Sequence, residues 1–204
     1  MMRQIKNIIL LFMQPFRMIN NMIRQLRMFI IPNLLLIISR KLEFDGSFPK
    51  CFQYTGITGI GKVEIGEDCM FGSRSGGFHR GGKIEFQARF KDASIVIGAN
   101  VQTNNNIFIC AGNRIKIGDN TLIGQNVTIM DFEAHGIDPD KRRQVGEIGQ
   151  VIVGENVWIG NNVTILKNTK IGDNSIVATG SIVTHSFPAN VIIGGVPAKI
   201  IRNI

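Results

Sequence analysis

The residue best placed to do chemistry is His135, one of only three histidines in the 204-residue chain. It lies in a polar, charged stretch, residues 131–149, which reads DFEAHGIDPDKRRQVGEIG and interrupts a regular pattern on either side. A long excursion from a repetitive scaffold is a common place for function. A neutral imidazole can remove a proton from a hydroxyl near pH 7. Taken alone, His135 reads better as a solvated loop histidine, so the surrounding pattern has to decide.

That pattern is an aliphatic residue at every sixth position. The positions are Ile117, Ile123, Ile129, Val153, Ile159, Ile165, Ile171, Val177 and Val183. A period of six does not match the 3.6-residue turn of an α-helix, and it suits short strands joined by tight corners. We therefore expect each aliphatic side chain to stack on its counterparts in neighbouring coils of a solenoid.

Residues that tolerate a left-handed backbone stand three positions after the aliphatic ones. They are Asp68, Asn100, Asn120, Asn126, Asn156, Asn162, Asn168, Asn174 and Gly180. Asn, Asp and Gly enter positive φ at the lowest cost, so each of these positions is expected to form a corner of the coil. The earlier coils are less regular, and insertions such as residues 74–82 are expected to interrupt them.

The C-terminal half resembles a known family. The run from Val153 to Ile201, VGENVWIGNNVTILKNTKIGDNSIVATGSIVTHSFPANVIIGGVPAKII, is similar to the hexapeptide-repeat acetyltransferases. These are relatives of the galactoside and maltose O-acetyltransferases and of enzymes that O-acetylate capsule and lipopolysaccharide sugars. The resemblance covers residues 95–204 well and 55–95 weakly. It implies a mainly β fold, a left-handed parallel β-helix with eighteen residues per coil, assembled as a homotrimer. The handedness follows from the resemblance alone, since parallel crossovers are generally right-handed.

Three parts are expected along the chain. Residues 1–44 form a short, apolar and basic α-helical segment, residues 45–188 form the hexapeptide-repeat β-helix with a loop insertion at 131–150, and residues 189–204 form a C-terminal tail. The first 42 residues contain seven Lys and Arg residues and no acid. They read as helical pieces interrupted at Pro15 and Pro32. The longest uncharged stretch, Met28 to Ser39, is shorter than the roughly 20 residues that span a bilayer.

Two roles for the N-terminal segment stay open. An apolar, basic segment without acids suits an interfacial helix on an anionic membrane. A helical lid over the open end of the solenoid suits it equally well. The formal net charge is +8, and because seven of those charges lie in residues 1–42, the body is nearly neutral. A nucleic-acid partner therefore gets little support.

The three cysteines and three histidines are widely separated and give no metal-ligand spacing, so no metal site is expected. An odd number of cysteines without close pairs fits a reducing compartment. We expect a cytoplasmic protein, with attachment to the inner face of the membrane as an option.

The resemblance assigns roles to single residues. A His-x-hydrophobic-Asp-Pro segment carries the catalytic histidine of the family, and here it reads His135 to Pro139, with Gly136 where the family usually has proline. His135 is then the general base, and Asn106 positions the substrate or polarises the reacting group. The tautomer of His135 needs a partner, for which Asp131, Glu133 and a backbone carbonyl are candidates.

The resemblance also places acetyl-CoA. Asn161, Thr179 and Thr184 match positions along the pantetheine arm, and Lys199 and Arg202 match basic positions at the nucleotide phosphates. A solvated tail is the alternative for these two basic residues. Trp158 is expected to stack at the groove between subunits, and plain surface packing is its alternative.

The resulting expectation is an acetyl-CoA-dependent O-acetyltransferase. The acceptor is a sugar hydroxyl, of a surface polysaccharide or of its lipid-linked precursor. Two alternatives remain: an N-acyltransferase of an amino sugar, and a scaffold of the same fold that lacks catalysis.

Overall fold

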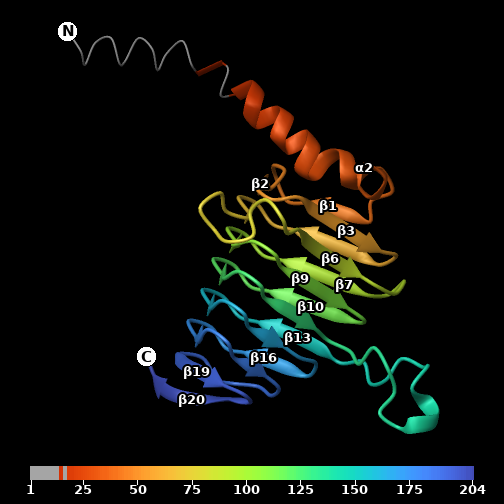
Figure 1. The fold of residues 1–204 in the computed structure, drawn as a ribbon, viewed down its shortest axis with the longest axis vertical. Helices are drawn as coiled ribbons and strands as arrows, with labels where there is room; N and C mark the ends of the chain where they lie inside the picture. The colour runs from red at the N-terminus through yellow and green to blue at the C-terminus, as the bar shows by residue number, and fades with distance from the viewer. Residues whose placement is uncertain (1–13, 16–17) are drawn as a thin grey trace.

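The chain winds into a stack of coils (Figure 1), each with three sides. The computed structural model describes residues 14–15 and 18–204, so the part of the expected N-terminal segment in residues 1–13, 16 and 17 lies outside the described residues. Three parallel sheets form the sides of the prism. Sheet A contains β1 (Leu42–Phe44), β4 (Lys62–Ile65), β7 (Ser94–Ile97), β10 (Arg114–Ile117), β13 (Gln150–Val153) and β16 (Thr169–Ile171).

The other two sheets follow A in each coil. Sheet B contains β2 (Lys50–Cys51), β5 (Met70–Phe71), β8 (Gln102–Thr103), β11 (Leu122–Ile123), β14 (Trp158–Ile159), β17 (Ile176–Val177), β19 (Val191–Gly195) and β20 (Ala198–Asn203). Sheet C contains β3 (Thr55–Gly59), β6 (Ile84–Ala88), β9 (Phe108–Ala111), β12 (Thr128–Met130), β15 (Thr164–Ile165) and β18 (Ile182–Val183). The predicted left-handed parallel β-helix is confirmed.

The strand registers give the length of each coil. In the last coils Trp158 pairs with Ile176 and Thr164 with Ile182, a step of eighteen residues. Earlier steps are longer, because Lys62 pairs with Ser94 across the insertion at 74–82. The predicted aliphatic positions lie inside the prism, and all nine of them are buried. Each layer of the core therefore removes apolar surface from water by stacking on the next.

The corners are formed by the residues that the spacing selects. All nine predicted positions have positive φ, between 53° at Asp68 and 76° at Gly180. The asparagines at these corners also bond to one another through their side-chain amides. One such ladder runs from Asn156 to Asn174 and on to Asn190. The corner asparagines therefore tie successive coils together, in addition to tolerating the backbone angle.

The N-terminal helix runs from Met18 to Ile38 without a break. It includes a π-helical turn, η1 (Leu26–Ile30), followed directly by α2 (Ile31–Ile38). The sequence predicts an interruption at Pro32, and the structure shows none. Proline lacks an N–H, and it stands at the start of α2, where the wider π turn precedes it. By length and composition alone this helix is long and apolar enough to cross a membrane.

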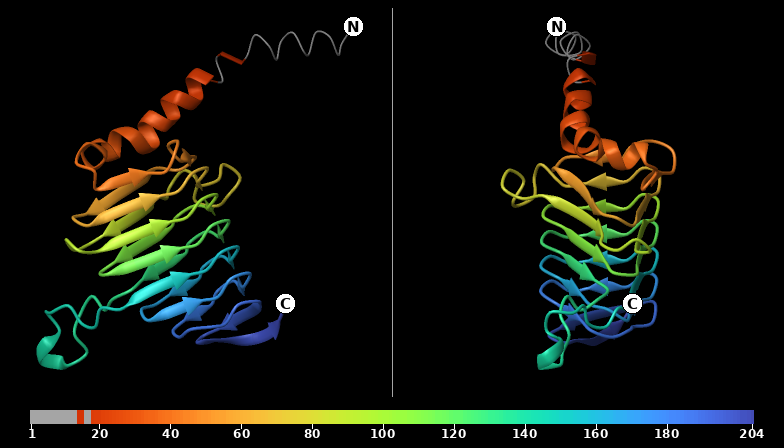
Figure 2. Two further views of the ribbon diagram at one scale, coloured as in Figure 1. Left: turned by 180° about the vertical axis from the view of Figure 1, so that it is seen from behind. Right: turned by 90° about the vertical axis from the view of Figure 1, so that its right-hand side faces the viewer.

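The same helix covers the open end of the prism (Figure 2). Phe29 is fully buried against the first coil. Asn33, which is also buried, donates to the carbonyl of Thr55 at 2.9 Å and accepts from the amide of Ile57 at 2.7 Å. The exposed edge of a sheet carries unpaired backbone groups. Through Asn33 the helix bonds the unpaired backbone groups of β3, so residues 18–38 act as a lid.

Candidate active site

A loop of charged residues leaves the prism after β12 and returns at β13 (Figure 1). Its first residue, Asp131, is fully buried and accepts hydrogen bonds from the amides of Gly112 and Asn113. Its own carbonyl accepts from Gly149 at the other end of the loop, at 2.7 Å. Burial raises the pKa of the Asp131 carboxyl, and the backbone amides partly offset this. Asp131 therefore anchors the loop and is not the partner of His135.

A second attachment holds the loop to the next coil. Lys167 forms ion pairs with Glu133, at 3.3 Å, and with Glu147. Asn168 donates to Glu147 at 2.7 Å. The hydrogen bond from Lys167 lowers the pKa of Glu147. Glu133, the second candidate partner of His135, is thus engaged with Lys167.

His135 sits on the outer part of this loop and is exposed. Its Nδ1 lies 2.8 Å from the backbone carbonyl oxygen of Arg142. A carbonyl only accepts hydrogen bonds, so Nδ1 must carry the proton and Nε2 is left as a free acceptor. The backbone on either side is also fixed, because the amide of Gly136 donates to the carbonyl of Gln144 at 2.8 Å. Of the three candidate partners, the backbone carbonyl is the one that orients this imidazole.

Asn106 lies at the corner between sheets B and C, with φ of 63°. Its amide nitrogen Nδ2 donates to Asn126 at 2.6 Å, and its backbone N–H donates to Gln53 at 2.7 Å. These contacts give Asn106 a structural role in the corner ladder. The residue is nevertheless exposed, and it lines a groove of about 290 Å³ together with Lys83, Glu85 and Thr128.

The sequence did not predict the polar residues around Asn106. Glu85 forms an ion pair with Lys83 at 2.6 Å, and the hydrogen bond from Lys83 lowers the pKa of Glu85. Gln53 is buried and also bonds the carbonyl of Phe78, which holds the insertion at 74–82 against the prism. The irregular spacing of the early coils left no signal for these residues.

Three of the predicted coenzyme residues lie together beside the same corner. Trp158 is exposed on β14, and with Asn161 it lines a second groove, of about 280 Å³. The amide of Asn161 donates to the hydroxyl of Thr179 at 3.3 Å, one coil further on. Asn161 and Thr179 thus lie in successive coils at the corner between sheets B and C, the corner at which Asn106 also lies.

The other three predicted coenzyme residues lie further along the chain. Thr184 follows β18, and its hydroxyl is 3.3 Å from Nδ1 of His185. Lys199 and Arg202 are exposed on β20, the last strand of sheet B, which pairs antiparallel with β19. They belong to an ordered strand on the same sheet as Trp158. The segment 189–204, expected as a tail, thus supplies the last two strands of sheet B.

The structure does not bring His135 and Asn106 together within one chain. Asn106 precedes β9 at the corner between sheets B and C. The His135 loop follows β12, at the corner between sheets C and A, and projects away from the prism (Figure 1). Asn106 and His135 therefore lie beyond opposite ends of the strands of sheet C. A site that uses both requires groups from two chains.

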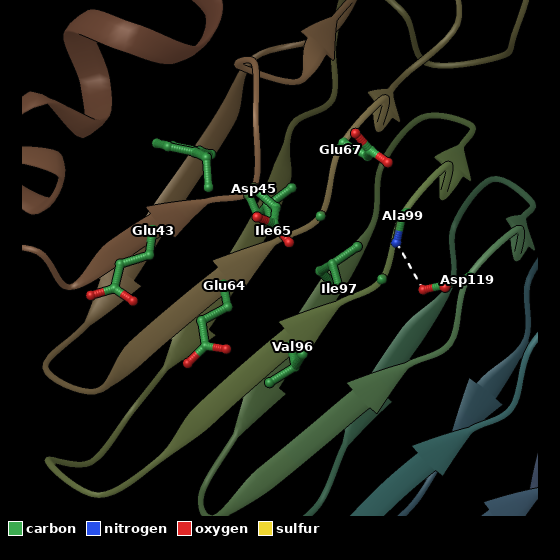
Figure 3. Close-up of a pocket in the computed structure, with 12 residues that line it drawn as sticks. Glu43, Asp45, Glu64, Ile65, Glu67, Val96, Ile97, Ala99 and Asp119 are labelled. Atoms are coloured by element: carbon green, nitrogen blue, oxygen red, sulfur yellow. Dashed lines mark hydrogen bonds between the residues drawn. The ribbon is translucent and has the colours of Figure 1, made fainter.

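A third groove, of about 440 Å³, lies on the outer side of sheet A (Figure 3). Its acidic lining consists of Glu43, Asp45, Glu64, Glu67 and Asp119. Asp119 accepts a hydrogen bond from the amide of Ala99 at 2.9 Å. A surface with this charge repels phosphate groups, so it does not suit a nucleotide coenzyme. Among the described residues, no group of three or more His, Cys, Asp or Glu side chains is placed to hold a metal ion.

Comparison with known proteins assigns the repeat to a class. Residues 150–185 match the family described as bacterial transferase hexapeptide (six repeats). Residues 62–82 and 114–138 match the family described as hexapeptide repeat of succinyl-transferase. The chain carries the hexapeptide repeat of bacterial transferases, and the resemblance read from its sequence is confirmed.

Particular relatives are acetyltransferases. Galactoside O-acetyltransferase of Lactococcus lactis subsp. lactis (strain IL1403) is 32% identical over 69% of this chain and 63% of its own length. The putative lipopolysaccharide biosynthesis O-acetyl transferase WbbJ of Escherichia coli (strain K12) is 39% identical over 53% of this chain and 60% of its own length. The chain thus covers less than two thirds of either relative.

A solved structure is also similar. A galactoside acetyltransferase in complex with coenzyme A superposes with a TM-score of 0.51 at 41% identity, over 54% of this chain and 55% of that one.

Proposed function

We propose that this chain is an acetyl-CoA-dependent O-acetyltransferase that acts on a sugar hydroxyl, with His135 as its general base. The observation that carries the proposal is the imidazole of His135, whose Nδ1 is held by the carbonyl of Arg142 and whose Nε2 is free. Similarity to acetyltransferases, one of them solved with coenzyme A, supports the class of reaction. Similarity to a galactoside O-acetyltransferase and to a putative lipopolysaccharide biosynthesis O-acetyl transferase supports a sugar acceptor.

The chemistry needs no covalent enzyme intermediate. The acceptor hydroxyl gives its proton to Nε2 of His135 while its oxygen attacks the thioester carbonyl carbon of acetyl-CoA. The C–S bond then breaks, and the leaving thiolate takes the proton back from the imidazolium. The hydrogen bond from Nδ1 to the Arg142 carbonyl stabilises the imidazolium during this step. Asn106 has a second amide N–H beyond the one given to Asn126, and we assign it to the developing oxyanion.

A homotrimer is part of the proposal, because one chain cannot complete the site. His135 and Asn106 lie beyond opposite ends of the strands of sheet C. A three-fold arrangement with heterologous contacts can set the loop of one subunit against the Asn106 corner of the next. Coenzyme would then lie in the groove between them, beside Trp158 and Asn161.

Mixed trimers test this arrangement. His135→Ala and Asn106→Ala chains, each impaired alone, should regain activity when they are unfolded and refolded together. Random mixing leaves about one quarter of the sites with an intact His135 facing an intact Asn106. Thiol release is measured on the mixed sample and on each variant refolded alone. Activity no higher than that of the single variants would contradict a site shared between subunits.

Lys199→Ala is expected to raise the KM for acetyl-CoA about tenfold, because one hydrogen bond to a charged group is lost. The turnover number should change little. Lys116→Ala is the matched control, since Lys116 is also exposed but lies on sheet A. An unchanged KM in Lys199→Ala would remove this residue from the phosphate site.

Thiol release from acetyl-CoA, measured against a panel of sugars, amino sugars and lipid-linked glycans, tests the function itself. Release that requires one hydroxyl acceptor establishes the O-acetyltransferase. Release only with amino sugars would favour the N-acyltransferase, and neither release nor coenzyme binding would favour a scaffold. We place the reaction on the cytoplasmic side of the membrane, where acetyl-CoA is available.

A further inference from the structure

Much of the exposed surface of the lid helix is apolar. The large apolar residues exposed on it are Met18, Ile19, Met22, Ile23, Leu26, Ile31, Leu34, Leu35 and Ile38, with exposed fractions from 36% to 81%. We call these nine residues the apolar lid face. The neighbouring positions in the described part of the helix provide few polar side chains to interrupt it. A contiguous apolar surface of this kind marks a site of interaction.

An ordinary surface helix buries one apolar stripe and exposes polar side chains on the rest of its surface. Here the inner side carries Gln25, Phe29 and Asn33, four residues apart. Gln25 accepts from the amide of Cys51 at 3.0 Å, and Asn33 bonds the edge of β3. Leu35 and Ile38 on the outer side are 81% and 69% exposed. The helix therefore holds the first coil through the polar groups of Gln25 and Asn33 and through buried Phe29, while nine other large apolar side chains remain exposed.

The π turn keeps the apolar lid face continuous. Leu26 begins η1 and Ile31 follows its end, five residues on, and the i to i+5 bonding between them makes a wider turn. In an uninterrupted α-helix a step of five would rotate Ile31 away from Leu26. The extra residue at the turn returns Ile31, and with it Leu35 and Ile38, to the side of the helix that carries Met22 and Leu26.

The charge of the segment selects the occupant. Residues 1–42 contain seven Lys and Arg residues and no acid. In the described part of the chain, no ion pair joins Arg27, Arg40 or Lys41 to an acid. Two copies packed through this face would bring like charges together without compensation. An anionic lipid surface offers both the apolar phase and the opposite charge.

We propose that the apolar lid face docks on an anionic lipid bilayer and holds the coil stack standing away from it. The His135 loop lies toward the end opposite to the lid (Figures 1 and 2). The loop returns at β13, which is four strand steps from β1 in sheet A. At 4.7–4.9 Å per step this is about 19 Å. If the protein is the O-acetyltransferase proposed above, on which this inference rests, its acceptor is a membrane-tethered glycan. That glycan must be long enough to reach from the bilayer to the His135 loop.

Vesicle binding of the full chain tests the docking. Wild type should sediment with vesicles of phosphatidylcholine and phosphatidylglycerol, less with pure phosphatidylcholine, and less as salt is raised. The Leu35→Asp/Ile38→Asp variant should bind the anionic vesicles about tenfold more weakly or worse. The reason is that two charged groups replace apolar side chains that enter the bilayer in the docked state. Ile60→Asp/Ile204→Asp is the control matched in charge, since both residues are exposed elsewhere. It should bind nearly as well as wild type.

The docking would be overturned if wild type did not bind anionic vesicles. It would also be overturned if the two double variants lost vesicle binding to the same extent. A fall in oligomer mass in Leu35→Asp/Ile38→Asp, measured by analytical ultracentrifugation, would assign the face to a second copy instead. Resistance of the bound protein to alkaline carbonate would indicate a spanning helix. Thiol release with a soluble acceptor, measured on the same variants, separates a failure of docking from a failure of the proposed function.

The distance of the His135 loop from the bilayer is tested with the acceptor sugar found by the panel. The sugar is tethered to vesicle lipid through spacers of increasing length. Vesicle-bound wild type should acetylate the sugar faster as the spacer lengthens toward about 20 Å. A rate that is highest with the shortest spacer would overturn the upright arrangement.

Discussion

His135→Ala is expected to lower the turnover number for thiol release from acetyl-CoA by about 10²–10⁴-fold, the usual contribution of a positioned general base. No other imidazole lies on the 131–150 loop. Asp131 is buried in backbone hydrogen bonds, and Glu133 is paired with Lys167. Coenzyme binding should persist, because the residues assigned to acetyl-CoA, such as Trp158 and Asn161, lie outside the loop.

Two measurements separate loss of the base from loss of structure. Coenzyme A at about 100 times its Kd should stabilise both wild type and His135→Ala by about 2.7 kcal/mol in a thermal shift. His185→Ala is the matched control, since His185 is exposed, stacks on Phe187 and is not part of the 131–150 loop. It should retain near-normal turnover at saturating acetyl-CoA. Full activity in His135→Ala would mean that another group takes the proton.

The β-helix was predictable because its signals are local. Each corner requires a residue that tolerates positive φ, and each coil requires an aliphatic residue in the core, so both requirements repeat along the chain. Asn162 and Ile165 illustrate this, since one takes the corner at φ 55° and the other is fully buried three positions later. A pattern of this kind can be read without knowing which coils are neighbours.

The environment of Asn106 was not predictable in the same way. Gln53 accepts a hydrogen bond from its backbone N–H although the two residues are 53 positions apart. Lys83 and Glu85 reach the same groove across an insertion that breaks the period. The spacing also could not separate two roles of Asn106, which serves the corner ladder through Nδ2 and lines a groove through its exposed side.

The partner of His135 shows a different limit. The sequence offered two nearby carboxylates and a backbone carbonyl, and the structure selects the carbonyl of Arg142. Every residue has a carbonyl, so the choice depends on how the loop folds back and not on residue type. The charges of Asp131 and Glu133 make them candidates in the sequence, but in the structure both residues attach the loop to the prism.

Asn33→Leu is expected to destabilise the protein by about 2–5 kcal/mol. The substitution keeps the approximate size of the side chain, but it leaves the amide of Ile57 and the carbonyl of Thr55 without partners in a buried position. Each unsatisfied buried group costs about 1–3 kcal/mol. Denaturant unfolding measures the total change. Hydrogen exchange should show the loss of protection first at Ile57, on the edge of β3 that the lid covers.

Asn21→Leu is the control for that change, because Asn21 is exposed on the same helix. Its effect should stay within about 0.5 kcal/mol, as for most surface substitutions. Equal stability of Asn33→Leu and Asn21→Leu would contradict the role of Asn33 in closing the prism. The pair also separates the two sides of the lid. Asn33→Leu weakens attachment to the first coil while every residue of the apolar lid face remains, so it should lower stability without abolishing vesicle binding. Leu35→Asp/Ile38→Asp should do the reverse.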